Sequence, residues 1–269
     1  MLNFSNVHMK FDKDVLSDIN LNIDSGEFVS ILGPSGCGKS TLLRLASNLA
    51  KPTKGVVDYI SPKDLSIGFV FQNPTLMPWR TVMENITLPL ELNKKKFSKE
   101  EALMWLARVG LKDKEKSYPN ELSGGQMMRV SIARSLINGC NLLLLDEPFA
   151  ALDEITRRKL EDDLLEIWEK EKFTVLFVTH SVSEAIYLSQ RVLVLSSGPG
   201  KIVYEKNISQ YISKEEFRES KEFQAINSEI FEKLKIMDRW VNDISCLLYT
   251  SDAADEGLGV DLGGRRIIK

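Results

Sequence analysis

The sequence predicts an α/β fold: a parallel β-sheet covered by helices, preceded by an antiparallel β subdomain and interrupted by an inserted α-helical subdomain. Apolar runs of strand length, Asn141–Asp146 and Thr174–Thr179, flank a charged helical segment from Glu154 to Glu171. Strands that alternate with helices favour a parallel sheet with right-handed crossovers. The first sixty residues instead alternate with period two, which is typical of half-buried antiparallel strands.

The first elements follow from this alternation and from turn residues. The positions Leu2, Phe4 and Val7, and then Ile19, Leu21 and Ile23, alternate with polar residues. A turn at Asp24–Gly26 precedes the apolar run Phe28–Leu32, which we expect to be a buried strand. A glycine-rich turn comes next, and leucines at helical spacing from Lys39 to Leu49 complete a strand, turn and helix.

From roughly Pro89 to Arg134 the pattern is helical and charged, and Ser98-Lys-Glu-Glu101 predicts a capping box before a helix over Ala102–Val109. This segment, about residues 89–134, is the predicted helical subdomain within a domain covering residues 1–204. Residues 205–245 predict a C-terminal extension of amphipathic helices. Its apolar set is Phe217, Phe223, Ile226, Ile230, Phe231 and Leu234.

The last segment, residues 246–269, has a different character. Its stretches Cys246–Glu256 and Val260–Ile268 resemble translated adapter oligonucleotides of sequencing libraries. We therefore interpret residues 246–269 as a non-native tail and leave them out of the fold. The alternative is a natural flexible tail.

Composition excludes several classes of function. The chain has 269 residues, a net charge of −3 and a pI near 5.7, so no large basic surface indicates nucleic acid as the main partner. The amino terminus does not resemble a signal peptide, and no apolar run is long enough to span a bilayer. We expect Cys37 and Cys140 to be reduced thiols, since the cysteines show neither disulfide nor zinc spacing.

A phosphate-binding loop lies between the predicted strand Phe28–Leu32 and the helix that follows it. The segment satisfies G-x-x-x-x-G-K-[ST], in which glycines let backbone N–H groups turn toward phosphate oxygens at a helix N-terminus. We expect Lys39 to reach the β- and γ-phosphates of a nucleotide and Ser40 to ligate Mg²⁺. The residues of the motif are Gly33, Pro34, Ser35, Gly36, Cys37, Gly38, Lys39, Ser40 and Thr41.

The strand from Leu142 ends in two adjacent carboxylates. At the end of this strand we expect Asp146 to hold hydrated magnesium and Glu147 to polarise an attacking water molecule. The alternative is a strand that merely ends in a solvated acidic turn, which the phosphate loop makes less favoured.

A third motif, Leu122-Ser-Gly-Gly-Gln126, opens a predicted helix with Ser123, Gly124 and Gly125. Their N–H groups and the hydroxyl form a second phosphate cradle. Together with the phosphate loop, the Asp-Glu pair and His180, this segment resembles the ABC ATPase family in order and spacing. The resemblance covers residues 2 to 204 and implies a P-loop NTPase (RecA-like) core. It also implies a head-to-tail homodimer in which Ser123, Gly124, Gly125 and Gln126 complete the ATP site of the other subunit.

Further roles are carried over from this resemblance. Gln72 matches the glutamine that contacts Mg²⁺ and water and connects to the helical subdomain. Asp153 matches the loop that crosses the dimer interface, and His180 matches the switch at the γ-phosphate. Taken alone, His180 at a strand end is equally compatible with a structural role. Phe11 aligns with the aromatic residue that stacks on adenine.

The segments Phe71–Arg80 and Val175–Ala185 resemble the import branch for nitrate, sulfonate, taurine and related solutes. An importer implies permease subunits, an extracytoplasmic binding protein acting indirectly, and a location at the cytoplasmic face of the membrane. Leu76, Met77, Pro78 and Trp79 form a candidate surface for a permease helix. Trp79 could instead pack inside the helical subdomain.

The sequence therefore predicts an ATPase that uses ATP and Mg²⁺ to drive uptake of a small solute. One rival is an ABC-type ATPase that acts on nucleic acid or the ribosome, although such chains usually carry coiled-coil insertions or a duplicated cassette. A second rival is a P-loop kinase, which has no need for Leu122–Gln126.

Overall fold

The computed structural model describes residues 1–60, 65–208 and 214–235. The strands are β1 (Leu2–Lys10), β2 (Asp14–Ile23), β3 (Phe28–Leu32), β4 (Lys54–Tyr59), β5 (Ile67–Val70), β6 (Leu142–Asp146), β7 (Thr174–Val178), β8 (Arg191–Leu195) and β9 (Ile202–Asn207). The helices are α1 (Lys39–Ala46), α2 (Val82–Leu92), α3 (Lys99–Arg108), α4 (Gly124–Leu136), α5 (Glu154–Glu171), α6 (Val182–Leu188) and α7 (Lys214–Glu219). Residues 221–235 form a further helical segment.

The larger sheet has six strands in the order β5-β6-β7-β3-β8-β9. All neighbouring pairs are parallel except β8 and β9. Every residue of β3 and β7 is buried, and so is every residue of β6 except Asp146. Such burial is expected when helices cover both faces of a parallel sheet. The predicted parallel sheet is thus confirmed, and β3 lies between β7 and β8 near its middle.

The smaller sheet is antiparallel, with strand order β2-β1-β4. Its alternating apolar residues, including Leu2, Phe4 and Val7, form a second core with α1 and one face of the larger sheet. This confirms the antiparallel β subdomain predicted from the alternation of the first sixty residues.

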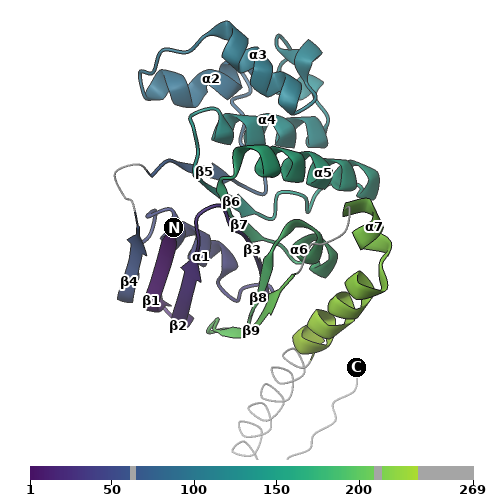
Figure 1. Ribbon diagram of the computed structural model, residues 1–269. Coiled ribbons are helices and arrows are strands. Elements are labelled where there is room, and N and C mark those ends of the chain that lie inside the picture. Colours follow the sequence, from purple (N-terminus) through teal and green to yellow (C-terminus); the bar gives the residue numbers. More distant parts are fainter. Residues whose placement is uncertain (61–64, 209–213, 236–269) are drawn as a thin grey trace, which may run out of the picture.

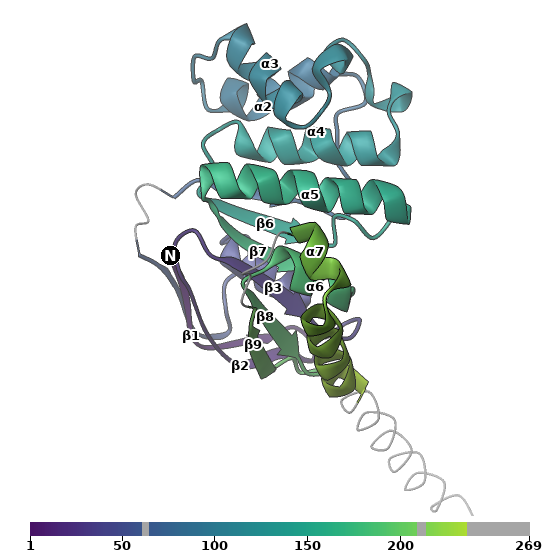
Figure 2. The same cartoon turned by 45° about the vertical axis from the view of Figure 1, so that its right-hand side comes forward.

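The helices α2, α3, α4 and α5 form layers above the larger sheet, whereas α1 lies beside the small sheet (Figure 1). Figure 2 shows α4 and α5 stacked side by side, with α2 and α3 beyond them and farthest from the small sheet. The helix α2 begins at Val82, earlier than the position near Pro89 at which we predicted the helical subdomain to start. Thr81 caps this helix through a capping box with Glu84, and Pro89 lies inside the helix. Within the described residues, no helix is both long enough and apolar enough to span a membrane.

The C-terminal segment differs in two ways from the prediction. Residues 205–207 belong to β9, an edge strand with alternating exposure, and are not helical. Phe217, Phe223, Ile226 and Ile230 are buried as predicted, and Leu234 packs against the core. Phe231 is half exposed, with the Lys235 ammonium 4.8 Å above its ring, because it faces away from the core. Residues 236–245 and the proposed tail, residues 246–269, lie outside the described residues.

Candidate functional site

The candidate site forms where three neighbouring strands end. In the larger sheet β6, β7 and β3 are adjacent and parallel, so the loops at their carboxyl ends meet at one edge. The phosphate loop follows β3, Asp146 ends β6 and is followed by Glu147, and His180 follows β7. Residues more than a hundred positions apart in the chain are brought together here by the sheet order.

The phosphate loop leads directly into α1. Gly38 occupies the N-cap position with φ of 100°, in the left-handed region, and makes no side-chain cap hydrogen bond. A Cβ at this position would lie 2.7 Å from a methyl carbon of Leu16, so glycine is required by space as well as by conformation. The first N–H groups of α1 are therefore left without a side-chain cap, which suits an anionic ligand.

Lys39 lies within this loop and is buried. Its Nζ donates hydrogen bonds to Gly33 O at 2.8 Å and Pro34 O at 2.9 Å. The loop thus holds the ammonium group beside the N-terminus of α1, where phosphate oxygens can replace the carbonyl partners.

Ser40 and Asp146 form an oxygen-donor pair. The Ser40 hydroxyl donates to Asp146 Oδ1 at 3.0 Å. Burial raises the pKa of Asp146, while the hydrogen bond from Ser40 and the charges of Arg44 and Lys39 lower it. A partly buried carboxylate next to a hydroxyl is a donor set that fits Mg²⁺, which takes few protein oxygens and keeps the remainder of its shell for water and phosphate.

Glu147 and His180 form the other pair of the site. Glu147 Oε1 lies 2.6 Å from His180 Nε2. Glu147 has φ of 49°, a left-handed conformation that is uncommon for a residue with a side chain. Its N–H donates to Val178 O at 2.9 Å, which ties the end of β6 to the end of β7 and places the carboxylate at the pocket.

Lys39, Ser40, Glu147 and His180 line one pocket of about 220 Å³, and Asp146 lies next to it through its hydrogen bond with Ser40. Its lining residues are Val15, Ser35, Gly36, Gly38, Lys39, Ser40, Thr41, Glu147 and His180. Sequence reasoning missed Val15, which lies at the start of β2 and accepts a hydrogen bond from Gly200 N. A single apolar residue in a strand carries no motif, so only the fold could show this contact.

Gly33, Pro34 and Cys37 belong to the phosphate loop but do not line the pocket. Gly33 and Pro34 provide the carbonyl partners of Lys39. Cys37 is buried, and its burial raises the pKa of the thiol. Both Cys37 and Cys140 are free, as predicted.

The Ser123 turn lies elsewhere and does not line this pocket. Ser123 is the N-cap of α4, and its side chain and that of Gln126 form a reciprocal capping box. A Cβ on Gly125 would lie 2.4 Å from Thr156 Cγ2 on α5, so only glycine fits the packing of these helices.

Asp153 caps α5, and the hydrogen bonds from Thr156 lower the pKa of its carboxyl.

Two predicted site residues are also separate from the pocket. Phe11 is 58% exposed, in the turn between β1 and β2, and Gln72 is exposed after β5. Neither lines the pocket of the phosphate loop. Their expected contacts are with a nucleotide and its metal, so both roles stay predictions.

Comparisons with known proteins agree with this geometry. Residues 16–150 match the ABC transporter family. An aliphatic sulfonates import ATP-binding protein of Bacillus cereus is 44% identical over 225 residues, which cover 82% of this chain and 88% of that protein. An uncharacterized ABC transporter ATP-binding protein of Methanocaldococcus jannaschii is 51% identical over 193 residues, which cover 70% of this chain and 72% of the relative.

A solved structure gives the same picture. An ATP-binding cassette determined as a dimer in a post-hydrolysis state, bound to ADP and Pi, superposes with a TM-score of 0.69. It is 35% identical in sequence, and the match covers 78% of this chain and all of the other. The phosphate loop, the carboxylate pair and these relatives together show that the chain belongs to the ABC transporter family and is an ATPase that couples ATP hydrolysis to transport.

Proposed function

We propose that this chain is the ATP-hydrolysing subunit of an importer for nitrate, a sulfonate, taurine or a related small solute. Its relatives in Bacillus cereus and Bacillus subtilis are named as aliphatic sulfonates import ATP-binding proteins, at 44% and 42% identity. In this proposal the chain acts as a homodimer on permease subunits at the cytoplasmic face of the membrane. An extracytoplasmic binding protein delivers the solute to the permease.

The observation that carries the proposal is the meeting of Lys39, Ser40, Glu147 and His180 around one pocket. Lys39 and the N-terminus of α1 bind the phosphates, and Ser40 and Asp146 would hold Mg²⁺. Held by these two side chains, Mg²⁺ would supply positive charge that offsets the charge of the nucleotide phosphates. Glu147 orients a water molecule and accepts its proton as the water oxygen attacks the γ-phosphorus. The bond between the γ-phosphorus and the bridging oxygen breaks, and ADP and phosphate result.

His180 supports this reaction through its position next to the base. Its Nε2 is 2.6 Å from Glu147 Oε1, so the imidazole fixes the direction of the carboxylate. From the same place it can reach the γ-phosphate, the role expected of the switch histidine. Gln72 and Phe11 are proposed to approach metal and adenine, respectively, when nucleotide is bound.

The other part of the proposal is a composite site. Ser123 does not line this pocket. It lies at the N-terminus of α4, in a different part of the subunit. In a two-fold dimer, a partner arranged head to tail can place its Ser123, Gly124 and Gly125 against the phosphates bound by Lys39. The related cassette was solved as a dimer, which supports a dimer of this chain.

The surface proposed for the permease is the loop between β5 and α2. Trp79 is 71% exposed, so the alternative that it packs inside the helical subdomain is wrong. Leu76 packs against the core and anchors the loop, while Pro78 is exposed beside Trp79. An exposed tryptophan on an anchored loop is a typical interface residue.

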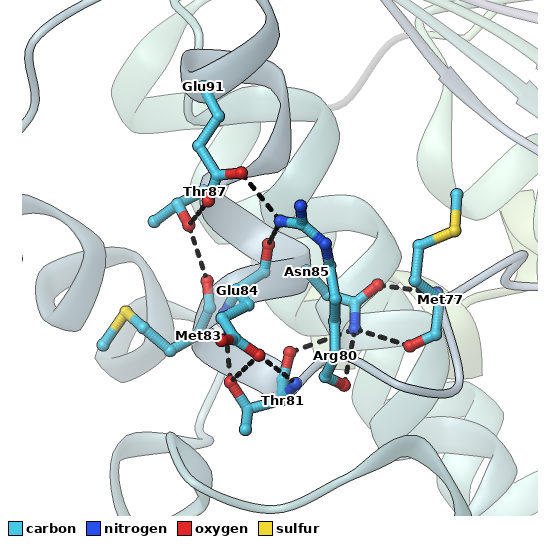
Figure 3. Close-up of polar contacts among 8 residues, drawn as sticks. All are labelled: Met77, Arg80, Thr81, Met83, Glu84, Asn85, Thr87 and Glu91. Atoms are coloured by element: carbon cyan, nitrogen blue, oxygen red, sulfur yellow. Dashed lines mark hydrogen bonds and ion pairs between the residues drawn. The ribbon is translucent and has the colours of Figure 1, made fainter.

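A buried asparagine holds this loop in place (Figure 3). Asn85 Oδ1 accepts a hydrogen bond from Met77 N at 2.8 Å, and its Nδ2 lies 3.0 to 3.1 Å from the carbonyl oxygens of Met77, Arg80 and Thr81. Arg80 in turn forms an ion pair with Glu91 at 2.7 Å. The loop is therefore preorganised, which lowers the entropy cost of docking a permease helix.

The proposal is tested by recovering the tagged chain from detergent-solubilised membranes of the cells that produce it naturally. We expect a polytopic membrane protein to co-purify with it. Recovery of nucleic acid or ribosomes without such a protein would instead support the rival ABC-type machine.

Matched variants locate the contact. Trp79→Ala should lower the recovered permease at least about fivefold, because interface tryptophans contribute strongly to binding. Leu92→Ala is the control, since Leu92 is 73% exposed on the same subdomain but outside the loop. Equal recovery with both variants would exclude Trp79 from the permease contact.

A further inference from the structure

The C-terminal extension contacts the catalytic domain through a charged pocket. The helix α7 packs against α6 (Figure 2). Phe217 on α7 is buried, and its ring lies 5.4 Å from that of Phe223. Beside these rings is a pocket of about 550 Å³ between α5, α6 and α7. Arg157 and Arg218 line it together with the buried carboxylates of Glu161 and Glu184.

Arg218 is the contribution of α7 to this pocket. Its Nη2 donates to Glu161 Oε2 at 2.5 Å and lies 3.5 Å from Asp162 Oδ1. The centre of its guanidinium is 3.4 Å from the ring centroid of Tyr187, whose hydroxyl donates to Asp162 Oδ1 at 2.5 Å. Arg218 is thus fixed by an ion pair on α5 and by an aromatic face on α6.

Glu161 depends on this cation. Its residue is 3% exposed, and burial raises the pKa of its carboxyl to about 7, while Arg218 lowers that pKa and the charge of Glu184 raises it. Glu184 is 6% exposed, and burial raises the pKa of its carboxyl as well. Two buried carboxylates that interact repel each other when both are ionised, so each needs a cation. Arg218 serves Glu161, and Arg157 lies 3.5 Å from Glu184 Oε1.

Glu184 connects this cluster to the switch segment. Its Oε2 accepts a hydrogen bond from the Thr179 hydroxyl at 2.5 Å. Thr179 Oγ1 in turn accepts from Ser181 N at 3.0 Å, and Ser181 Oγ accepts from Glu184 N at 3.3 Å. The residues on both sides of His180 are therefore held by Glu184, while His180 itself contacts Glu147.

We propose that Arg218 is a positioning residue for ATP hydrolysis, supplying from the C-terminal extension the second cation that lets Glu161 and Glu184 coexist beside the His180 segment. Without Arg218, Glu161 competes with Glu184 for Arg157 and for a proton. Either outcome loosens the hold of Glu184 on Thr179 and Ser181. His180 then loses its fixed direction toward Glu147, and the chemical step slows.

The test measures kcat and KM for ATP in the purified full chain. In Arg218→Ala we expect kcat to fall about tenfold with KM changed less than about twofold, because a small displacement of a catalytic group affects mainly the chemical step. Arg218→Lys should restore most of kcat, since it returns the cation. The double variant Arg218→Ala with Glu161→Gln should also recover kcat, since it removes the carboxylate that lacks a partner.

Lys206→Ala is the matched control, because Lys206 pairs with Glu229 of the helical segment 221–235 and does not touch Glu161. Its kcat should match that of the wild type. An unchanged kcat in Arg218→Ala would overturn the proposal. So would a double variant that falls below Arg218→Ala, since a general loss of packing would then explain the effect.

The inference rests on the role proposed for His180, and a parallel variant separates the two. If His180→Ala keeps wild-type turnover, the role of the switch histidine fails. If His180→Ala is inactive while Arg218→Ala is unaffected, only the inference on Arg218 fails.

Discussion

The N-termini of α1 and α4, the two proposed phosphate cradles, are built in different ways. At α1 the N-cap is Gly38, no side chain caps the helix, and Lys39 is held beside it. At α4 the N-cap is Ser123, and its hydroxyl already accepts a hydrogen bond from Gln126 N. The first cradle is open and lies beside Glu147 and His180, whereas the second is closed by its own cap. A single chain can therefore accept an anion at the N-terminus of α1, whereas α4 is proposed to contribute only from a second molecule.

The largest expected effect concerns the chemistry at the first cradle. Glu147→Gln should lower turnover about a thousandfold, because it removes the base while keeping the size of the side chain. ATP should then hold the protein as a dimer, as measured by light scattering with and without ATP. Adding Ser123→Ala should weaken that dimer, because the second cradle is proposed to lie at its interface. Turnover close to wild type in Glu147→Gln would disprove the assignment of the base.

The next effect separates binding from assembly. Lys39→Ala should weaken ATP binding to the monomer about a hundredfold, since it removes a charge-assisted contact to phosphate. Ser123→Ala should leave monomer binding unchanged. Isothermal titration at protein concentrations below dimerisation measures both. Equal loss in the two variants would contradict the assignment of the cradles to different sites.

Mixing the two variants tests the composite site directly. Lys39→Ala and Ser123→Ala homodimers should each be nearly inactive. With random exchange, half of the dimers are mixed and each has one intact site of two, so about a quarter of wild-type activity should return. No recovery after exchange, confirmed by differently tagged subunits, would argue against a head-to-tail dimer.

The smallest effect compares two serine caps of the same type. Ser98 accepts from Glu101 N as Ser123 accepts from Gln126 N, so Ser98→Ala and Ser123→Ala should each lower stability by about 1 kcal/mol. Urea unfolding measures this loss. Only Ser123→Ala should also lower ATPase activity, whereas a similar drop in Ser98→Ala would show that the activity follows stability alone.

Much of the fold could be predicted because local patterns agree with the final contacts. The segment from Glu154 to Glu171 is α5, since Asp153 caps it and its apolar face repeats with helical period. The end of β9 was wrongly assigned to helix because Glu205 and Lys206 on an exposed edge carry no strand signal. The early start of α2 at Val82 depends on the Thr81 cap and lies seven residues before Pro89, the position from which the helical pattern is recognised in the sequence.

The residues of the candidate site could be predicted from the sequence where they belong to a motif. Residues that only the fold brings together could not be predicted. Lys39, Asp146 and Glu147 belong to motifs whose spacing reflects the chemistry. The contact of Arg218 with Glu161 joins residues 57 positions apart, and neither residue lies in a motif. Such a pair depends on the docking of α7 on α6, which no local pattern specifies.

Gly125 is proposed to lie near phosphate in the dimer, yet its backbone also sits against Thr156 of α5. A side chain here would push α4 and α5 apart even if no nucleotide ever bound. Gly125 belongs to the motif by which this kind of ATPase is detected in a sequence. The close spacing of α4 and α5 also requires glycine at this position. A substitution at this position can abolish activity by changing the shape of the subunit, before any phosphate contact is lost.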